Sequence, residues 1–147
     1  MLFVCTHGTA KSLLAKLFFE RASAPSWNML RALSRAIDPD EAVPDWMRSA
    51  LSREGFEIGT WRPSPLSRAD IDAAERVITF DVAPQESLVA YLRIAGGGRA
   101  ALSCRHEAWD GLPALSENYA AGRKEIATRV EALAEELGAA TPLTRAP

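Results

Sequence analysis

The residues best suited to chemistry lie near the start of the chain, in the segment Cys-Thr-His-Gly-Thr-Ala-Lys-Ser that runs from Cys5 to Ser12. The apolar run from Met1 to Cys5 predicts a strand buried on both faces, and apolar residues at helical spacing after Ser12 predict a helix. A short loop between a strand and a helix points several backbone N–H groups at one place, and the helix dipole adds positive potential there. We therefore expect the segment to bind a phosphate-sized anion.

Cys5 is expected at the end of the predicted strand, beside this positive potential, which favours the thiolate form of a cysteine. A thiolate beneath a bound oxyanion is placed to attack it. Lys11 would supply a cation for the anion, and the Ser12 hydroxyl could stabilise the thiolate. On these residues alone, a plain core cysteine is an equally good interpretation, because free cysteine packs like a small hydrophobe.

Two other uses of these residue types are disfavoured by their spacing. The pair Lys11-Ser12 resembles the end of a nucleotide-binding P-loop, but that motif needs glycine at the positions of Cys5 and Ala10. The chain has two histidines and no Cys/His spacing typical of a metal site. We therefore expect neither a nucleotide nor a metal or other cofactor.

The elements that must position the loop alternate between strand and helix. Such alternation predicts an α/β fold, a three-layer sandwich with a central four-stranded parallel sheet and helices on both faces. Ligands bind such sheets at the carboxyl ends of the strands, which makes the segment after Cys5 the default site. The later predicted elements are a strand within Trp27–Ile37, a helix from Pro44 to Gly55, a turn with a capping box at Ser67 and Asp70, a strand at Arg76–Phe80, a helix from Pro84, a strand at Arg99–Cys104 and a helix at Ser116–Leu137.

Composition bounds the protein class. The 147 residues suit a single domain, which we place at residues 1–138 with a C-terminal tail at 139–147. The 17 basic and 19 acidic side chains give a net charge of -2, so neither nucleic acid nor a membrane is an expected partner. With two cysteines, no membrane-spanning run and no signal peptide in the sequence, a cytoplasmic location is expected.

The sequence resembles the low-molecular-weight protein tyrosine phosphatases, a family that also contains thioredoxin-coupled arsenate reductases. The resemblance runs in order through nearly the whole chain. It implies the phosphotyrosine phosphatase I-like fold and hydrolysis of a phosphomonoester through a phosphocysteine on Cys5. The segments that carry it are Leu2-Phe3-Val4-Cys5-Thr6, Ser12-Leu13-Leu14-Ala15, Leu51 to Phe56, Ser64-Pro65-Leu66, Ala74 to Asp81, and Trp109 to Pro113 with the helix that follows.

The loop departs from the family pattern at two positions. The family reads Cys-x5-Arg-Ser, usually with asparagine three residues after the cysteine, whereas this chain has Lys11 and Gly8 at those places. Arginine grips two phosphoryl oxygens with a planar fork that lysine cannot reproduce. Losing a transition-state donor commonly costs about 10² to 10³ in rate, so weak or altered activity is expected. The implied oxyanion-binding loop comprises Thr6, His7, Gly8, Thr9, Ala10 and Ser12, with Lys11 as the catalytic cation.

The general acid of the family is an aspartate in an Asp-Pro pair before the last helix. This chain has Asp110-Gly111-Leu112-Pro113 there, so Asp110 is the candidate proton donor and a solvated loop aspartate is the competing interpretation. Asp38-Pro39 lies in the wrong third of the chain. Arsenate reductases would place resolving cysteines after the middle strand, where this chain has Asp81-Val82-Ala83, which leaves only Cys104.

Other candidates have plain alternatives. His7 is expected to be exposed and idle, and His106 could reach the carboxyl end of the sheet. Trp61 and Trp109 could flank the loop as an aromatic rim, although most tryptophans simply pack. Cys104 is expected to be a core residue.

Three functions therefore remain open. The first is a phosphatase-like enzyme that acts on an aryl phosphate or a phosphorylated protein. The second is a catalytically degenerate protein that binds phosphate, a similar oxyanion or a phosphorylated partner without turnover. The third is an arsenate reductase-like enzyme.

Overall fold

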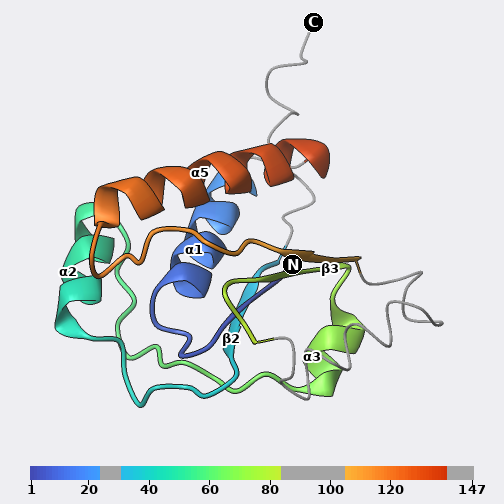
Figure 1. Cartoon of the computed structure of the whole chain (residues 1–147), viewed down its shortest axis with the longest axis horizontal. Coiled ribbons are helices and arrows are strands. Elements are labelled where there is room, and N and C mark those ends of the chain that lie inside the picture. Colours follow the sequence, from blue (N-terminus) through green and yellow to red (C-terminus); the bar gives the residue numbers. More distant parts are fainter. Residues whose placement is uncertain (24–30, 84–104, 139–147) are drawn as a thin grey trace, which may run out of the picture.

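A parallel sheet forms the centre of the computed structural model, which describes residues 1–23, 31–83 and 105–138. Four strands are seen in this part of the chain, in the order β2-β1-β3-β4. β1 lies inside the sheet, with β2 and β3 parallel on its two sides (Figure 1). The predicted fold class is confirmed. The strands are β1 (Leu2–Cys5), β2 (Leu33–Ala36), β3 (Arg76–Thr79) and β4 (Arg105–Ala108).

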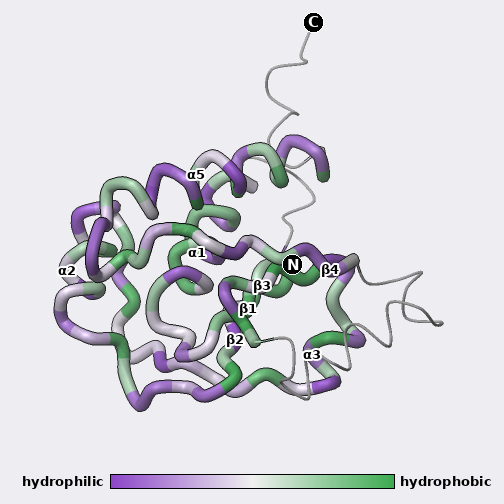
Figure 2. Tube along the Cα trace, in the orientation of Figure 1, coloured by the Kyte–Doolittle hydropathy of each residue, from purple (hydrophilic) through white to green (hydrophobic). Residues whose placement is uncertain are grey.

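The described helices cover both faces of the sheet. α1 and α5 lie together on one face, and α3 lies on the other (Figure 1). α5 alternates between hydrophilic and hydrophobic turns, as a surface helix with one buried stripe does (Figure 2). The helices are α1 (Lys11–Ser23), α2 (Asp45–Arg53), α3 (Arg68–Ala73) and α5 (Tyr119–Glu136).

Alternation along the strands divides the core between these faces. Phe3 and Ile78 pack with residues of α1, α2 and α5, whereas Leu2, Val4 and Val77 pack with residues on and around α3. All five side chains are fully buried. Burying each contributes roughly 1.5–3 kcal/mol, so β1 and β3 are held rigidly in place. A rigid β1 gives Cys5, its last residue, a well-defined position.

Local sequence signals account for two of the helix boundaries. Ser67 Oγ accepts from the Asp70 amide at 3.1 Å, and Asp70 Oδ2 accepts from the Ser67 amide at 3.0 Å. This is the predicted capping box, which helps a helix of six residues that would be unstable alone. α2 follows Pro44 as predicted, and Gly55 lies just past its end with a φ of +89°.

Other predicted elements differ from the structure or lie outside it. The predicted strand within Trp27–Ile37 is confirmed as β2. The last helix begins at Tyr119, three residues later than predicted, because Asn118 caps it through a bond to the Ala121 amide. Residues 24–30, 84–104 and 139–147 are outside the described residues, and with them the helix from Pro84, the strand at Arg99–Cys104 and the tail. Within the described helices, none is long and apolar enough to cross a membrane.

Candidate active site

Cys5 stands where the resemblance places the nucleophile, at the carboxyl end of β1 and below the turn that leads into α1. Its Sγ receives a hydrogen bond from the Gly8 amide at 3.2 Å. The Ser12 hydroxyl lies 2.9 Å from the same sulfur. The thiol is half-buried and forms no disulfide. A loop amide and a hydroxyl therefore meet at the sulfur, and both can donate to a thiolate.

Ser34 extends this network and was missed at the sequence level. Its hydroxyl lies on β2, is almost fully buried, and is 2.9 Å from the Ser12 hydroxyl. The strand register explains the contact, because Ser34 pairs with Phe3 and so faces α1 beside the buried Ser12. A chain of two hydroxyls therefore runs from β2 to the sulfur of Cys5. A lone serine in an ambiguous strand gives no signal of this role.

Gly8 shapes the turn above the cysteine. Its φ is +74°, and a Cβ built on it would come within 2.8 Å of the Ala36 Cβ and 3.1 Å of the Pro63 Cβ. The position therefore needs glycine twice over, for its backbone conformation and for the close approach of two neighbouring segments. Glycine at position 8, which departs from the family pattern, therefore suits the backbone conformation and the close packing found at this position.

The outer arm of the loop is tied to the segment after β2. The Thr9 hydroxyl donates to Asp40 at 3.3 Å, and His7 Nδ1 lies 3.5 Å from the other carboxylate oxygen of Asp40. The Asp38 amide donates to the Thr6 carbonyl at 2.7 Å. His7 is exposed as predicted, with 58% of its side chain accessible, but its contact with Asp40 means that it is not idle. Sequence reasoning gave Asp40 no role.

A pocket of about 220 Å³ opens over Cys5. Trp46 at the start of α2 forms part of its wall and is 41% exposed. Trp61 and Trp109, the expected rim, are not among the lining residues, and Trp109 is buried against Phe3 and Phe80. The pocket is lined by Cys5 to Lys11, Trp46, Phe80, Asp81 and Ala114 to Ser116.

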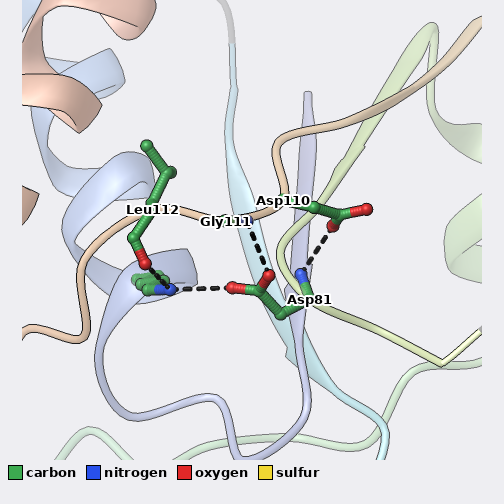
Figure 3. Close-up of polar contacts among 5 residues, drawn as sticks. Asp81, Asp110, Gly111 and Leu112 are labelled. Atoms are coloured by element: carbon green, nitrogen blue, oxygen red, sulfur yellow. Dashed lines mark hydrogen bonds and ion pairs between the residues drawn. The ribbon is translucent and has the colours of Figure 1, made fainter.

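Lys11 lines this pocket, and its ammonium group already has two hydrogen-bond partners. Its Nζ donates to Asp81 Oδ2 at 2.8 Å and to the Leu112 carbonyl at 2.8 Å (Figure 3). Burial would raise the pKa of Asp81, but hydrogen bonds from Lys11 and the Gly111 amide outweigh it and hold that pKa below its usual value. The cation of the site is thus balanced by a carboxylate of the same pocket.

Asp110, the candidate proton donor, faces the backbone of Asp81. Its Oδ1 accepts from the Asp81 amide at 2.8 Å, while the Gly111 amide donates to Asp81 Oδ1 at 2.8 Å (Figure 3). These two reciprocal bonds join the end of β3 to the segment after β4. Asp110 is exposed and is not among the residues that line the pocket. Asp81 lines it, although the sequence gave no signal of this.

His106 lies apart from this site. His106 Nε2 is 2.9 Å from the buried Thr79 hydroxyl, and the ring borders a second cavity of about 300 Å³ with Arg76, Glu107 and Glu136. That cavity is larger, but its lining among the described residues contains no cysteine, serine or threonine. Cys104 is outside the described residues. In residues 1–23, 31–83 and 105–138, no group of three His, Cys, Asp or Glu side chains could hold a metal ion.

Solved structures share this fold. The YwlE arginine phosphatase from Geobacillus stearothermophilus is similar at a TM-score of 0.67 and 22% identity, over 99% of this chain and 96% of that one. A low-molecular-weight protein tyrosine phosphatase from Streptococcus pyogenes is similar at 0.70 and 13%, over 92% and 91%. A thioredoxin-dependent arsenate reductase from Corynebacterium glutamicum is similar at 0.66 and 22%, over 93% of this chain and 60% of that one.

No family model and no curated protein sequence matches the chain significantly. The likeness therefore lies in the three-dimensional arrangement, and it agrees with the resemblance seen in the sequence. The identities are low, so the likeness speaks for the fold and leaves the activity to be argued from the site. The chain has the α/β fold shared by low-molecular-weight protein tyrosine phosphatases and arsenate reductases, with Cys5 at the carboxyl end of its first strand.

Proposed function

We propose that the protein is a phosphatase-like enzyme that hydrolyses a phosphomonoester through a phosphocysteine on Cys5, with weak or altered activity. The observation that carries the proposal is the environment of the Cys5 sulfur. The sulfur accepts a hydrogen bond from the Gly8 amide at 3.2 Å and lies 2.9 Å from the Ser12 hydroxyl. A structural cysteine has no need of two such partners beneath an open pocket. Both partners can donate a hydrogen bond to a thiolate, which is the nucleophilic form of cysteine.

The residues around the pocket suit the steps of this reaction. The loop amides, the N-terminus of α1 and Lys11 would hold the phosphoryl oxygens. The sulfur of Cys5 would attack phosphorus, so that an S–P bond forms while the bond to the leaving oxygen breaks. A carboxylic acid would protonate that oxygen, and water would then cleave the S–P bond. A similar structure, a YwlE arginine phosphatase variant, carries a phosphorylated active-site serine, which supports a covalent route.

The substrate proposal follows from the wall of the pocket. Trp46, Phe80 and Leu115 offer apolar surface beside the loop. An aromatic or aliphatic group attached to the phosphate would pack there, whereas a small polar ester would not. We therefore expect an aryl phosphate or a phosphorylated side chain of a partner protein to be preferred over free sugar phosphates.

The second candidate is an oxyanion-binding protein without turnover. Lys11 favours it, because the ammonium stands where the family has arginine and already donates to Asp81 and Leu112. An ammonium held in this way lacks the planar fork of arginine and stabilises the transition state poorly. An arsenate reductase-like reaction needs a second thiol, and its only candidate, Cys104, lies outside the described residues.

Hydrolysis of p-nitrophenyl phosphate between about pH 5 and 8 separates these candidates. Wild type, Cys5→Ser and Lys11→Arg are assayed together. Turnover by wild type that Cys5→Ser abolishes supports the hydrolase, and Lys11→Arg should raise it by up to about 10². Silence from wild type, with activity gained in Lys11→Arg, would support the binding protein. Loss of wild-type turnover in Cys104→Ser, measured with arsenate and thioredoxin, would instead support the reductase.

A further inference from the structure

Asp81 is the carboxylate that lines the pocket over Cys5, and we propose that it is the general acid of this site, taking up its proton when a bound oxyanion draws Lys11 away from it. The inference rests on the proposed hydrolase and names a residue that the family comparison does not. Asp110 then acts as a positioning residue, because its carboxylate holds the backbone of Asp81.

The geometry separates the two carboxylates. Asp81 lines the pocket over Cys5, and Asp110 does not. Asp81 also has a φ of +51°, the only positive φ of a non-glycine residue in the described part of the chain. Such conformations persist where surrounding contacts hold them, here the reciprocal bonds to Asp110 and Gly111 (Figure 3). The backbone is therefore held in an unusual conformation that presents the Asp81 carboxylate to the pocket.

Lys11 links that carboxylate to the ligand. A phosphoryl group in the loop needs the ammonium that now donates to Asp81 at 2.8 Å. When Lys11 turns to the ligand, Asp81 loses its cation and gains a dianion as neighbour. Both changes raise the pKa of a carboxyl group, and the burial that already acts in this direction is no longer outweighed. With 46% of its side chain exposed, Asp81 can take the proton from solvent.

Among the described charged groups around the pocket, Asp81 is the one whose surroundings change when Lys11 turns to the ligand. From the loop, Lys11 and His7 line the pocket with the thiol of Cys5. His7 Nδ1 lies 3.5 Å from a carboxylate oxygen of Asp40. From the segment after β4, Asp110 is engaged by the Asp81 amide. The other lining residues that the structure describes, from α2, the end of β3 and the 114–116 segment, carry no charge.

The chemical step balances with this assignment. The thiolate of Cys5 forms the S–P bond, the P–O bond to the leaving group breaks, and the leaving oxygen takes the proton of the Asp81 carboxylic acid. In the second half, a water attacks phosphorus, the Asp81 carboxylate takes its proton, and the S–P bond breaks to restore the thiolate. The sum is ester plus water to alcohol plus phosphate.

The first test measures proton uptake when sulfate binds, by calorimetry at about pH 5 in two buffers of different ionisation enthalpy. Sulfate does not titrate in this range, so the proton must enter the protein. Wild type should take up about one proton, and Asp110→Asn should keep that uptake because its amide oxygen can still accept from Asp81. Asp81→Asn should take up none and should bind sulfate severalfold more tightly, because the competitor for Lys11 is gone. Equal uptake in Asp81→Asn, or no sulfate binding by wild type, would overturn the proposal.

The second test compares leaving groups. Asp81→Asn should lower kcat for phenyl phosphate, a poor leaving group, by about 10² to 10⁴, and kcat for p-nitrophenyl phosphate far less. Asp110→Asn should change both only slightly and by a similar factor, because its amide oxygen can still hold the backbone of Asp81. Glu125→Gln on the exposed face of α5 controls for the loss of a carboxylate.

The outcomes keep the two proposals distinct. Cys5-dependent turnover in which Asp110→Asn, and not Asp81→Asn, shows the leaving-group effect would overturn the role of Asp81 alone. If sulfate binding is accompanied by the expected proton uptake but neither ester shows Cys5-dependent turnover, the proposed hydrolase is overturned, and with it catalysis by Asp81. Tighter sulfate binding together with slower hydrolysis in Asp81→Asn is the combination that a merely structural role would not produce.

Discussion

Gly8 is the residue whose backbone most directly shapes the site, because its amide donates to the sulfur of Cys5 and an added Cβ would come too close to Ala36 and Pro63. Any side chain at this position meets two separate obstacles. The first is the positive φ, which costs an L-residue roughly 1–2 kcal/mol. The second is the close approach of neighbouring atoms, and overpacking of this kind costs about 1–3 kcal/mol.

Gly8→Ala should therefore lower the free energy of unfolding by about 2–5 kcal/mol, measured by urea denaturation. Gly59→Ala is the matched control, because Gly59 also has a positive φ but has no atoms within 4 Å of an added Cβ. It should lose only the backbone contribution, about 1–2 kcal/mol. Equal losses in the two variants would show that the Cβ at position 8 finds room, and the tight packing described above would be wrong.

At the residue scale, sequence reasoning reached as far as local signals extend. The positions of Cys5 and Ser12 follow from a motif of eight residues, and the structure places the two groups together. Ser34, Asp40 and Asp81 meet the same site from positions 29 to 76 residues beyond Cys5, and no local pattern marks them. Their roles depend on strand register and loop paths, which a single sequence does not state.

Helices α1, α2 and α5 meet at a polar joint above the core. Arg123 on α5 binds both carboxylate oxygens of Glu54, which follows α2, and one of these bonds measures 2.8 Å. Tyr119 donates to Glu54 at 3.2 Å, and the Arg21 guanidinium stacks 4.5 Å from the centre of the Phe56 ring. The hydrogen bond from Arg123 lowers the pKa of Glu54 despite burial. The joint ties the helix that leaves the active-site loop to the terminal helix.

The joint predicts how stability depends on alkaline pH. Burial, followed by the nearby Glu54 charge, raises the pKa of Tyr119 to about 12 from an ordinary value of 10. Because the folded state holds this proton more tightly, its contribution is complete below about pH 10 and is lost as pH rises towards 12. The free energy of unfolding should fall more steeply over this range in wild type than in Tyr119→Phe.

Thermal unfolding of wild type and Tyr119→Phe at a series of pH values measures that difference, and tyrosinate absorbance reports the titration. Alkaline pH also affects other parts of both proteins, so only the difference between the two proteins is interpreted. Tyr91→Phe is measured as well, because Tyr91 and Tyr119 are the two tyrosines of the chain and both contribute to the tyrosinate absorbance. A difference between wild type and Tyr119→Phe that stays constant from about pH 9 to 12 would contradict the prediction.

At the element scale, some helices carry local boundary signals in the sequence, whereas β4 carries none. The Ser67 capping box and the Pro44 start lie within a few residues of the ends that they mark. β4 reads Arg-His-Glu-Ala and carries no apolar run, because it lies at the edge of the sheet, where one side of the strand has no partner among the described strands. Its strand character comes from pairing with β3, which is a tertiary effect.

The whole molecule explains why the site has the parts it has. All four strands of the described sheet run in the same direction, so the segments that follow them meet at one edge. β1 contributes the Cys5 loop, β2 leads to Asp38 and Asp40, β3 to Asp81, and β4 to Asp110. Parallel topology was predictable from the alternation of elements, and it brings the segments of the candidate site together. The pairing of Lys11 with Asp81 was not, because it joins residues 70 positions apart.

Anion binding at this edge should stabilise the entire fold, since the loop is rigid only when the sheet is formed. Sulfate at about one hundred times its dissociation constant should add about 2.7 kcal/mol to the free energy of unfolding, a rise in Tm of roughly 5–10 °C for a chain of this length. The rise is measured by scanning calorimetry with and without sulfate. Cys5→Ser should keep it, because a hydroxyl of similar size leaves the loop amides and Lys11 in place.

Lys11→Met should lose most of that rise, because, among the residues that the structure describes, Lys11 is the only lysine or arginine that lines the pocket. Lys16→Met is the matched control, since Lys16 lies on the same helix and pairs with Glu20 at 3.5 Å, outside the residues that line the pocket. Removing Lys11 also breaks its bonds to Asp81 and Leu112, so the sulfate-dependent rise is compared and not the Tm itself. If the sulfate-dependent rise in Tm persists in Lys11→Met and disappears in Lys16→Met, the anion binds elsewhere on the molecule. The hypothesis that the loop is an oxyanion site would then be wrong.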